Sequence, residues 1–211
     1  MTNMKAKRAI TATRNYTQGA RAEATEATGQ RIVDAFLARL MTEWYDEITH
    51  ARVAEDAGVT VQTIVRRFGG KEGLLADAVK ILAAQINARR AMPSGSIEDL
   101  VDNVVADYEK TGDAVIRLLA LEPRHPALKQ FLDVGRSEHR RWVAAIFATQ
   151  LKALDARARN RALDALYLAT DVYAWKLLRR DMGHGAASVA RTMKKMVSAV
   201  LAEFVSNHKE N

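Results

Sequence analysis

The chain has few of the residues that interrupt or cross-link secondary structure. Of its 211 residues none is cysteine, three are proline and eleven are glycine. Without cysteine, the chain has no disulfide bond, no thiolate zinc site and no cysteine nucleophile, as suits a reducing compartment. A chain that is 48% hydrophobic with so little proline and glycine favours an all-α fold.

Long apolar runs are also missing. No stretch of about 18 apolar residues occurs, so the sequence predicts no membrane span and no membrane partner. The basic N-terminus is not followed by the apolar core of a secretory signal. We therefore expect a cytoplasmic protein.

The motifs of common enzyme sites are absent as well. The five histidines form no His-Glu-x-x-His pair, no glycine-rich phosphate loop follows a strand, and no Gly-x-Ser-x-Gly turn occurs. The sequence thus predicts no catalytic residue, no metal site and no cofactor. A helical enzyme remains a remote alternative.

Positive charge is unevenly spread along the chain, whose net charge is +7. Residues 1–22 carry five basic and no acidic side chains, whereas residues 23–75 carry six basic and nine acidic ones. Residues 1–22 also lack an apolar period, and we expect them to form a flexible basic arm. Such an arm either lies along DNA or is only a solubilising tail.

A helix-turn-helix pattern occupies residues 48–75. Thr49 starts a short helix that ends at Gly58, and Thr60 starts a second one that ends near Phe68. Threonine can accept hydrogen bonds from the unpaired N–H groups of a first helical turn, and glycine adopts the left-handed conformation that ends a helix. The second helix of such a unit enters the major groove of DNA. The alternative is a helical hairpin with no role in DNA binding.

These residues resemble the DNA-binding domain of the TetR family of one-component transcriptional regulators, over about residues 28–80. That domain has a Thr-capped helix, an Ala-Gly-Val-Ser/Thr turn, a short recognition helix ending in Phe, and Lys-Glu-x-Leu-Leu opening a connector helix. This sequence has Thr49, Ala57-Gly58-Val59-Thr60, Phe68 and Lys71-Glu72-Gly73-Leu74-Leu75 in the same order. It departs from the family at two positions: Val61 stands where a basic residue is usual, and Val65 where Tyr is usual.

The resemblance implies an all-α protein in several parts. After the arm, residues 23–75 would form a three-helix DNA-binding domain, and a connector helix would occupy about residues 71–91. Residues 96–211 would form a larger helical domain for effector binding and dimerisation. The implied function is a transcriptional regulator, usually a repressor, that binds a palindromic operator in double-stranded DNA.

Candidate DNA contacts follow from the chemistry of individual side chains. Gln62 can pair with adenine, and Thr63 offers a hydroxyl and a methyl group to thymine. Helix starts favour phosphate, cations neutralise it, and exposed valines can contact thymine methyl groups. The candidates are Thr49, Thr60, Val61, Gln62, Thr63, Val65, Arg66, Arg67 and Lys71.

The C-terminal part is predicted to form a series of amphipathic helices. Apolar residues at helical spacing predict helices at about 97–110, 114–121, 127–153, 155–181 and 186–205, with Gly112 separating the first two and Asp155 capping the fourth. The last two are apolar over more than one face, and such a helix needs a second surface to cover it. In TetR-like proteins the corresponding pair packs against its copy, so the resemblance implies a homodimer formed through residues 155–181 and 186–205.

The resemblance also implies a small-molecule site among these helices. The large, partly polar side chains best placed to line it are Tyr108, Phe131, Trp142, Tyr167 and Trp175, with Asp171 and His139 as polar anchors. Ordinary core packing is the alternative for each of them. Because no strong polar cluster marks the apolar faces, we expect an apolar or amphipathic effector. A constitutive or structural DNA-binding protein with no effector is the alternative for the whole chain.

Overall fold

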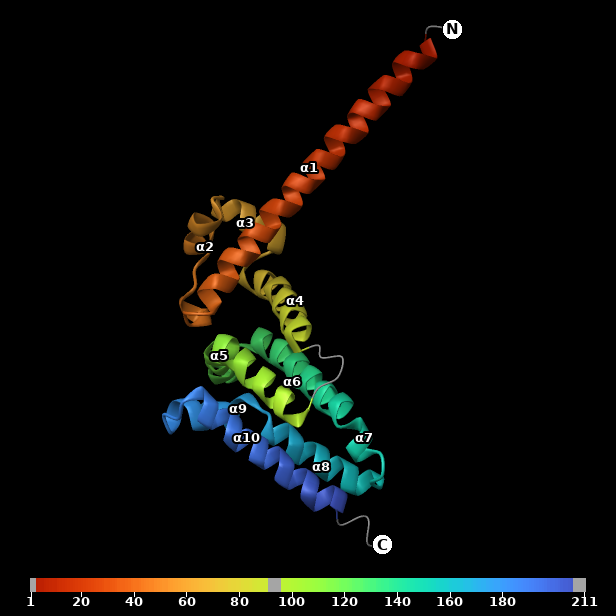
Figure 1. Cartoon of the computed structure of the whole chain (residues 1–211). Helices are drawn as coiled ribbons and strands as arrows, with labels where there is room; N and C mark the ends of the chain where they lie inside the picture. Colours follow the sequence, from red (N-terminus) through yellow and green to blue (C-terminus); the bar gives the residue numbers. More distant parts are fainter. Residues whose placement is uncertain (1–2, 91–95, 207–211) are drawn as a thin grey trace. The chain divides into compact units, whose positions relative to one another are not determined.

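The computed structural model describes the backbone of residues 3–90 and 96–206, and the side chains of residues 21–90, 96–97 and 99–204 (Figure 1). Over these ranges the chain is helical and contains no strand, which confirms the predicted all-α fold. The contacts divide the chain into two compact units. We call Met1–Leu40 with Asp46–Ala78 the head, and Met41–Tyr45 with Val79–Asn211 the body.

The head is built on α1 (Asn3–Leu40), α2 (His50–Ala57) and α3 (Val61–Phe68). Helix α2 packs against both α1 and α3. The centre of the head is apolar and includes Ile32, Phe36, Leu40, Ile48, Val53, Ile64, Leu74 and Leu75, each at most 2% exposed. This core fixes the orientation of α3, the predicted recognition helix.

Helix α1 begins much earlier than the sequence predicts. Residues 3–20, expected as a flexible arm, have a helical backbone continuous with the rest of α1. Alanine, lysine and arginine, which are frequent in this stretch, are strong helix formers, although Gly19 and several threonine and asparagine residues have lower helix propensity. Whether these residues contact DNA stays a prediction.

The connector helix α4 (Lys71–Arg90) starts in the head and ends in the body. The body continues with α5 (Ile97–Leu121), α6 (Pro126–Ile146), α7 (Ala148–Leu151), α8 (Ala156–Ala169), α9 (Val172–Lys176) and α10 (Ala186–Leu201). Two π-helical segments, Leu177–Asp181 and Ala202–Ser206, follow α9 and α10. No helix in the described residues is long and apolar enough to span a membrane.

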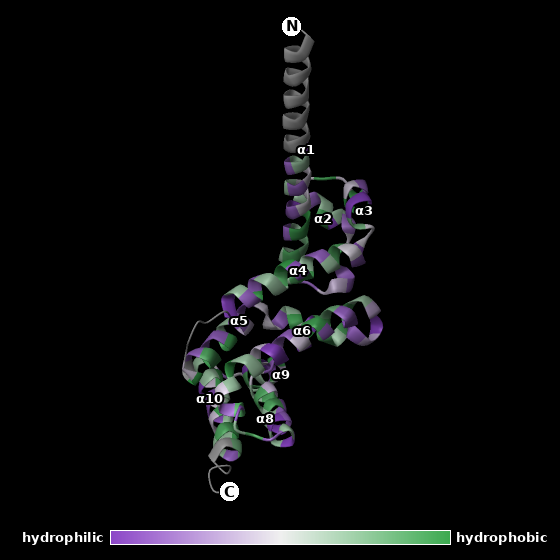
Figure 2. Ribbon diagram, turned by 90° about the vertical axis from the view of Figure 1, so that its right-hand side faces the viewer, coloured by the Kyte–Doolittle hydropathy of each residue, from purple (hydrophilic) through white to green (hydrophobic). Residues whose placement is uncertain are grey.

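Helix α5 is the centre of the body. It packs against α6, α9 and α10, while α8 packs against α6 and α10. Hydrophobic residues lie along all of these helices (Figure 2). Those that are completely buried include Val101, Val104, Val143, Phe147, Leu166, Trp175, Val189, Met193 and Val197.

The predicted break in the first body helix at Gly112 is wrong, because α5 runs unbroken from Ile97 to Leu121. A Cβ atom at position 112 would lie only 2.5 Å from the Trp175 ring. Trp175 is completely buried. Glycine therefore stands at this position because it allows a tryptophan ring to contact the backbone of α5, rather than because the helix ends there.

Two predicted long helices are each divided. Residues 127–153 break at Phe147 between α6 and α7, and residues 155–181 break between α8 and α9. Asp155 caps α8 as predicted, since its carboxylate accepts from the Arg157 and Ala158 N–H groups at 2.8 and 2.9 Å. Asp171 caps α9 in the same way, accepting from the Tyr173 N–H group at 2.9 Å. Such local side-chain bonds compete with a continuous helix.

Candidate functional site

The turn between α2 and α3 has the predicted caps. The Thr49 hydroxyl accepts from the Arg52 N–H group, and the Thr60 hydroxyl accepts from that of Thr63. Gly58 ends α2 in the left-handed region, with φ of 63°. Each threonine thus satisfies one otherwise unpaired donor and fixes the start of its helix.

Helix α3 has one buried face and one exposed face. Ile64 is completely buried, whereas Val61 and Val65 are each 40% exposed. Gln62 and Arg66 are also exposed, and Arg66 forms no ion pair with any residue that the structure describes. The Thr63 hydroxyl lies 3.0 Å from that of Thr60. A helix with this exposed face of apolar, amide and basic side chains can enter a groove that offers base edges and phosphates.

Arg67 points back into the head. Its guanidinium donates to the Glu26 carboxylate at 2.7 Å and to the Thr25 carbonyl at 2.8 Å, joining α3 to α1. It also lies directly against Gly29, where a Cβ atom would come within 2.2 Å of it. The contact leaves Arg66 as the arginine of α3 that faces solvent.

Lys71 begins α4 in a half-buried position. Burial lowers the pKa of its ammonium group, and the nearby Asp46 carboxylate acts in the opposite direction. Lys71 is the first residue of the connector helix and follows closely after the end of α3 at Phe68.

The body contains a cavity of about 440 Å³ between α4, α5, α6, α8 and α9, which opens to solvent beside the exposed side chains of Val134, Leu168 and Tyr173. Its lining is mostly apolar. Of the predicted ligand-binding residues, five line the cavity together with His139: Tyr108, Phe131, Trp142, Tyr167 and Asp171. A cavity of this size can hold a drug-sized molecule.

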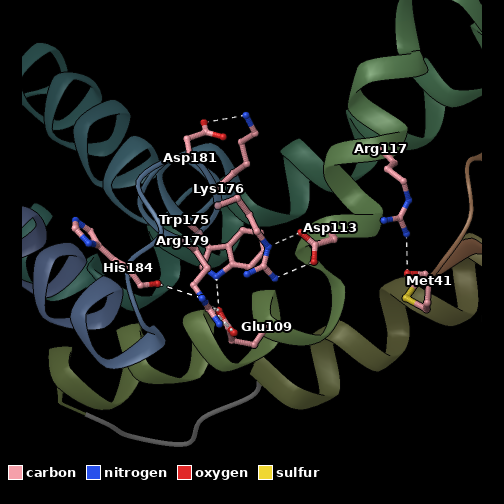
Figure 3. A network of polar contacts seen from close by, with 10 residues as sticks. Met41, Glu109, Asp113, Arg117, Trp175, Lys176, Arg179, Asp181 and His184 are labelled. Carbon is pink, nitrogen blue, oxygen red and sulfur yellow. Dashed lines mark hydrogen bonds and ion pairs between the residues drawn. The ribbon is translucent and has the colours of Figure 1, made fainter.

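Trp175, the sixth predicted residue, lies outside the cavity lining. It packs into the core beside Gly112, and its indole N–H donates to the Glu109 carboxylate at 2.9 Å (Figure 3). Arg179 donates to the same carboxylate at 2.9 Å. Burial raises the pKa of Glu109, but these hydrogen bonds and the charges of the two neighbouring arginines leave it below its ordinary value. Trp175 therefore joins α9 to α5.

One wall of the cavity contains a buried ion pair that the sequence pattern does not predict. Asp107 of α5, 2% exposed, binds the guanidinium groups of both Arg89 and Arg90 at the end of α4. Arg90 reaches Asp107 through Nε at 3.0 Å and through Nη2 at 2.8 Å. The signal was an acidic residue on an apolar face, because Asp107 lies one turn from the buried Val104 and two turns from Leu100.

A chain of hydrogen bonds continues from Arg90 across the cavity wall. Arg90 Nη1 lies 3.2 Å from Nδ1 of His139, and Nε2 of His139 lies 3.2 Å from the Thr170 hydroxyl. Because arginine can only donate, Nδ1 accepts and Nε2 carries the proton that it donates to Thr170. Thr170 then donates to the Leu166 carbonyl at 2.9 Å. Burial, followed by the charge of Arg90, lowers the pKa of His139 to about 3, so this histidine is neutral.

The described residues contain no group of three His, Asp or Glu side chains arranged to hold a metal ion. Several polar groups of the cavity are hydrogen-bonded within the protein: Arg90 contacts His139, His139 contacts Thr170, and the Tyr108 hydroxyl donates to the Thr170 carbonyl at 3.0 Å.

Part of the chain matches a known protein family. Residues 39–78 match the family described as "Bacterial regulatory proteins, tetR family". No curated protein sequence matches the chain at a significant level.

Several solved structures are similar in fold. A transcriptional regulator from Rhodococcus sp. Rha1 has a TM-score of 0.65 and 14% identity, covering 83% of this chain and 96% of that one. A proposed TetR-family regulator from Mesorhizobium loti has a TM-score of 0.67 and 20% identity, covering 85% and 97%. A proposed transcriptional regulator from Pseudomonas aeruginosa has a TM-score of 0.66 and 16% identity, covering 88% and 94%. At these identities the likeness concerns the fold.

Proposed function

Since the chain belongs to the TetR family of bacterial regulatory proteins by its residues 39–78, we propose that it is a transcriptional repressor released from DNA by a small molecule. The observation that carries the proposal is the face of α3. Its core-facing side holds the buried Ile64, while Gln62 and Arg66 extend into solvent. Such a face is suited to the major groove.

The proposed DNA contacts follow from these positions. Gln62 and Thr63 read bases, and Val61 and Val65 contact thymine methyl groups. The starts of α2 and α3 at Thr49 and Thr60, with Arg66 and Lys71, bind phosphates. Arg67 is engaged with Glu26, and we assign it to holding α3 against α1.

We propose that two copies bind a palindromic operator, because operator symmetry mirrors the symmetry of a dimer. The region predicted as the dimer interface, residues 155–181 and 186–205, supports this. It contains several exposed apolar side chains in the single chain: Leu168, Tyr173 and Leu177 are each more than half exposed. A second copy would cover them.

The cavity supports release by an effector. Arg90, the last described residue of the connector helix, lies in the cavity wall and binds Asp107 of α5 and His139 of α6. A ligand that requires a different position of Arg90 would act on the helix that leads to the head. It must bind the two states with different affinities, because a ligand with equal affinity for both changes nothing.

Selection of bound duplexes from a random DNA pool, with the full-length protein at a fixed salt concentration, tests the proposal. We expect recovery of a palindrome, and a mass of two chains in analytical ultracentrifugation. Salt-sensitive binding without any recovered motif would contradict the assignment of α3 as a sequence reader. A mass of one chain, both alone and on DNA, would contradict the dimer.

A further inference from the structure

Four ionisable side chains line the cavity in addition to tyrosine and histidine: Arg90, Arg136, Glu138 and Asp171. Three of them have an oppositely charged partner within the body. Arg90 pairs with Asp107, Arg136 with Glu122 and Asp133, and Glu138 with Arg141. Arg136 and Glu138 are thus paired within the protein, whereas Arg90 shares Asp107 with Arg89, so that this cluster keeps one net positive charge.

Asp171 is the exception. Its carboxylate accepts from the Tyr173 N–H group at 2.9 Å, but it forms no ion pair with any lysine or arginine in the part of the chain that the structure describes. Burial raises its pKa, and the surrounding N–H groups, the Tyr167 hydroxyl and the charge of Arg136 only partly oppose this. A carboxylate in this position gains from a cation that enters the cavity.

The cavity that holds this carboxylate is also lined by aromatic rings, and the Tyr167 hydroxyl hydrogen-bonds to Asp171. Phe131, Tyr167 and Tyr173 line the cavity with it, and Tyr167 and Tyr173 come from the same stretch of chain. The Trp142 ring already has the Arg90 guanidinium over it and His139 stacked against it. A mostly apolar cavity that holds aromatic rings and a carboxylate favours organic cations, because ring faces attract positive charge and apolar walls accept the rest of the molecule.

We propose that the effector is an amphipathic organic cation whose amine or quaternary ammonium group binds Asp171 beside Tyr167 and Tyr173, with its apolar part filling the cavity. This inference rests on the proposed function, since it names the chemical class of the effector. The cluster of Arg89, Arg90 and Asp107 keeps a net positive charge, but Asp107 binds Arg90 through two nitrogens and holds it in the cavity wall, whereas Asp171 has no cation bound to it. An organic anion would have to compete with Asp107 for Arg90 and would add a second negative charge near Asp171.

Calorimetric titration of the full-length protein, without DNA, compares three probes with the same apolar chain. Decyltrimethylammonium carries a positive charge, decyl sulfate a negative one, and decanol none. We expect the cation to bind at least about tenfold more tightly than the sulfate. Tighter binding of decyl sulfate, or binding of none of the three, would overturn the proposal.

The variant Asp171→Asn locates the cation. Asparagine caps a helix about as well as aspartate, so α9 keeps its N-cap while the charge is lost. We expect affinity for decyltrimethylammonium to fall by about tenfold and affinity for decanol to stay unchanged. The matched control is Asp155→Asn, which removes the charge of the α8 N-cap outside the cavity and should leave both affinities unchanged. Unchanged cation affinity in Asp171→Asn would overturn the proposal.

These outcomes are separable from those of the proposed function. Selection from a DNA pool needs no effector, so recovery of a palindrome together with failure of cation binding would reject only the effector class. Failure of the selection together with Asp171-dependent cation binding would reject the DNA reader instead.

Discussion

The head and the body use their polar side chains in opposite ways. In α3 of the head, Gln62 and Arg66 extend into solvent and make no contribution to the core. In the body, Asp107 and His139 are buried, and both contact the guanidinium group of Arg90. The head thus keeps polar groups available for a partner, whereas the body satisfies most of its own within the cavity wall.

Because of this difference, the same residue type, arginine, has different energetic roles in the two units. An exposed arginine such as Arg66 adds little to stability, because water solvates it in both the folded and the unfolded state. Arg90, 9% exposed, must keep its partner, since an unpaired buried charge is strongly destabilising. Whether an arginine is paired depends on its local surroundings and not on whether it belongs to the head or the body. Arg67 lies in the head and yet pairs with Glu26.

The largest expected effect is on the stability of the body. Asp107→Ala leaves Arg89 and Arg90 without their carboxylate, and we expect the free energy of unfolding to fall by about 3–5 kcal/mol. All three tryptophans lie in the body, so urea unfolding followed by tryptophan fluorescence measures this unit.

The matched control for this variant is Asp164→Ala. Asp164 pairs with Arg140, but both side chains are well exposed, and such a pair contributes about 0–1 kcal/mol. Equal losses in the two variants would show that burial does not distinguish these ion pairs.

A smaller effect is expected on DNA recognition by the head. Gln62→Ala should reduce the preference for one base at one operator position by about 1–3 kcal/mol, because a single base contact is lost. Arg66→Ala should instead weaken binding to all sequences alike and flatten its salt dependence. Quantitative binding to a randomised operator distinguishes the two. A uniform loss in Gln62→Ala would remove Gln62 from the base readers, and neither variant should change the stability of the body.

Much of the head could be predicted from the sequence because its signals are local. Thr49 and Thr60 each bond to a backbone N–H group three residues away, and Gly58 is required by the left-handed turn itself. Such features depend on a few neighbouring residues. Arg67 differs, since its partner Glu26 is 41 positions away and nothing in the sequence pairs them.

The cavity could be predicted only in part. Large aromatic side chains at helical spacing indicated Tyr108, Phe131 and Trp142, but the same spacing also suits a core residue, as Trp175 proves to be. Gly112 was misread because glycine looks the same in sequence whether it ends a helix or admits a neighbouring ring. The Asp107 ion pair depends on how α4 packs on α5, which no local pattern specifies.

The smallest expected effect is the pH dependence of stability that comes from His139, a member of the buried network of the body. Its pKa is about 3 in the folded state and near 6.5 when unfolded, so below pH 6.5 the unfolded state binds the additional proton. Stability is therefore fully present above that value and is lost as the pH falls toward 3. Between about pH 7 and about pH 5.5 the loss is about 1 kcal/mol. His139→Gln should lower stability at neutral pH but remove this dependence.

Asp171 acts in the opposite direction, because its raised pKa makes the folded state bind protons more readily as the pH falls. The effect of Asp171 is present both in the wild type and in His139→Gln. We therefore measure the unfolding free energy of both proteins at the two pH values, and the difference between them reports on the histidine alone. A difference that does not change with pH would mean that His139 gains its proton in the folded body as readily as in the unfolded chain. The orientation of the hydrogen bonds from Arg90 to Thr170 would then be wrong, since a protonated imidazole cannot accept from a guanidinium.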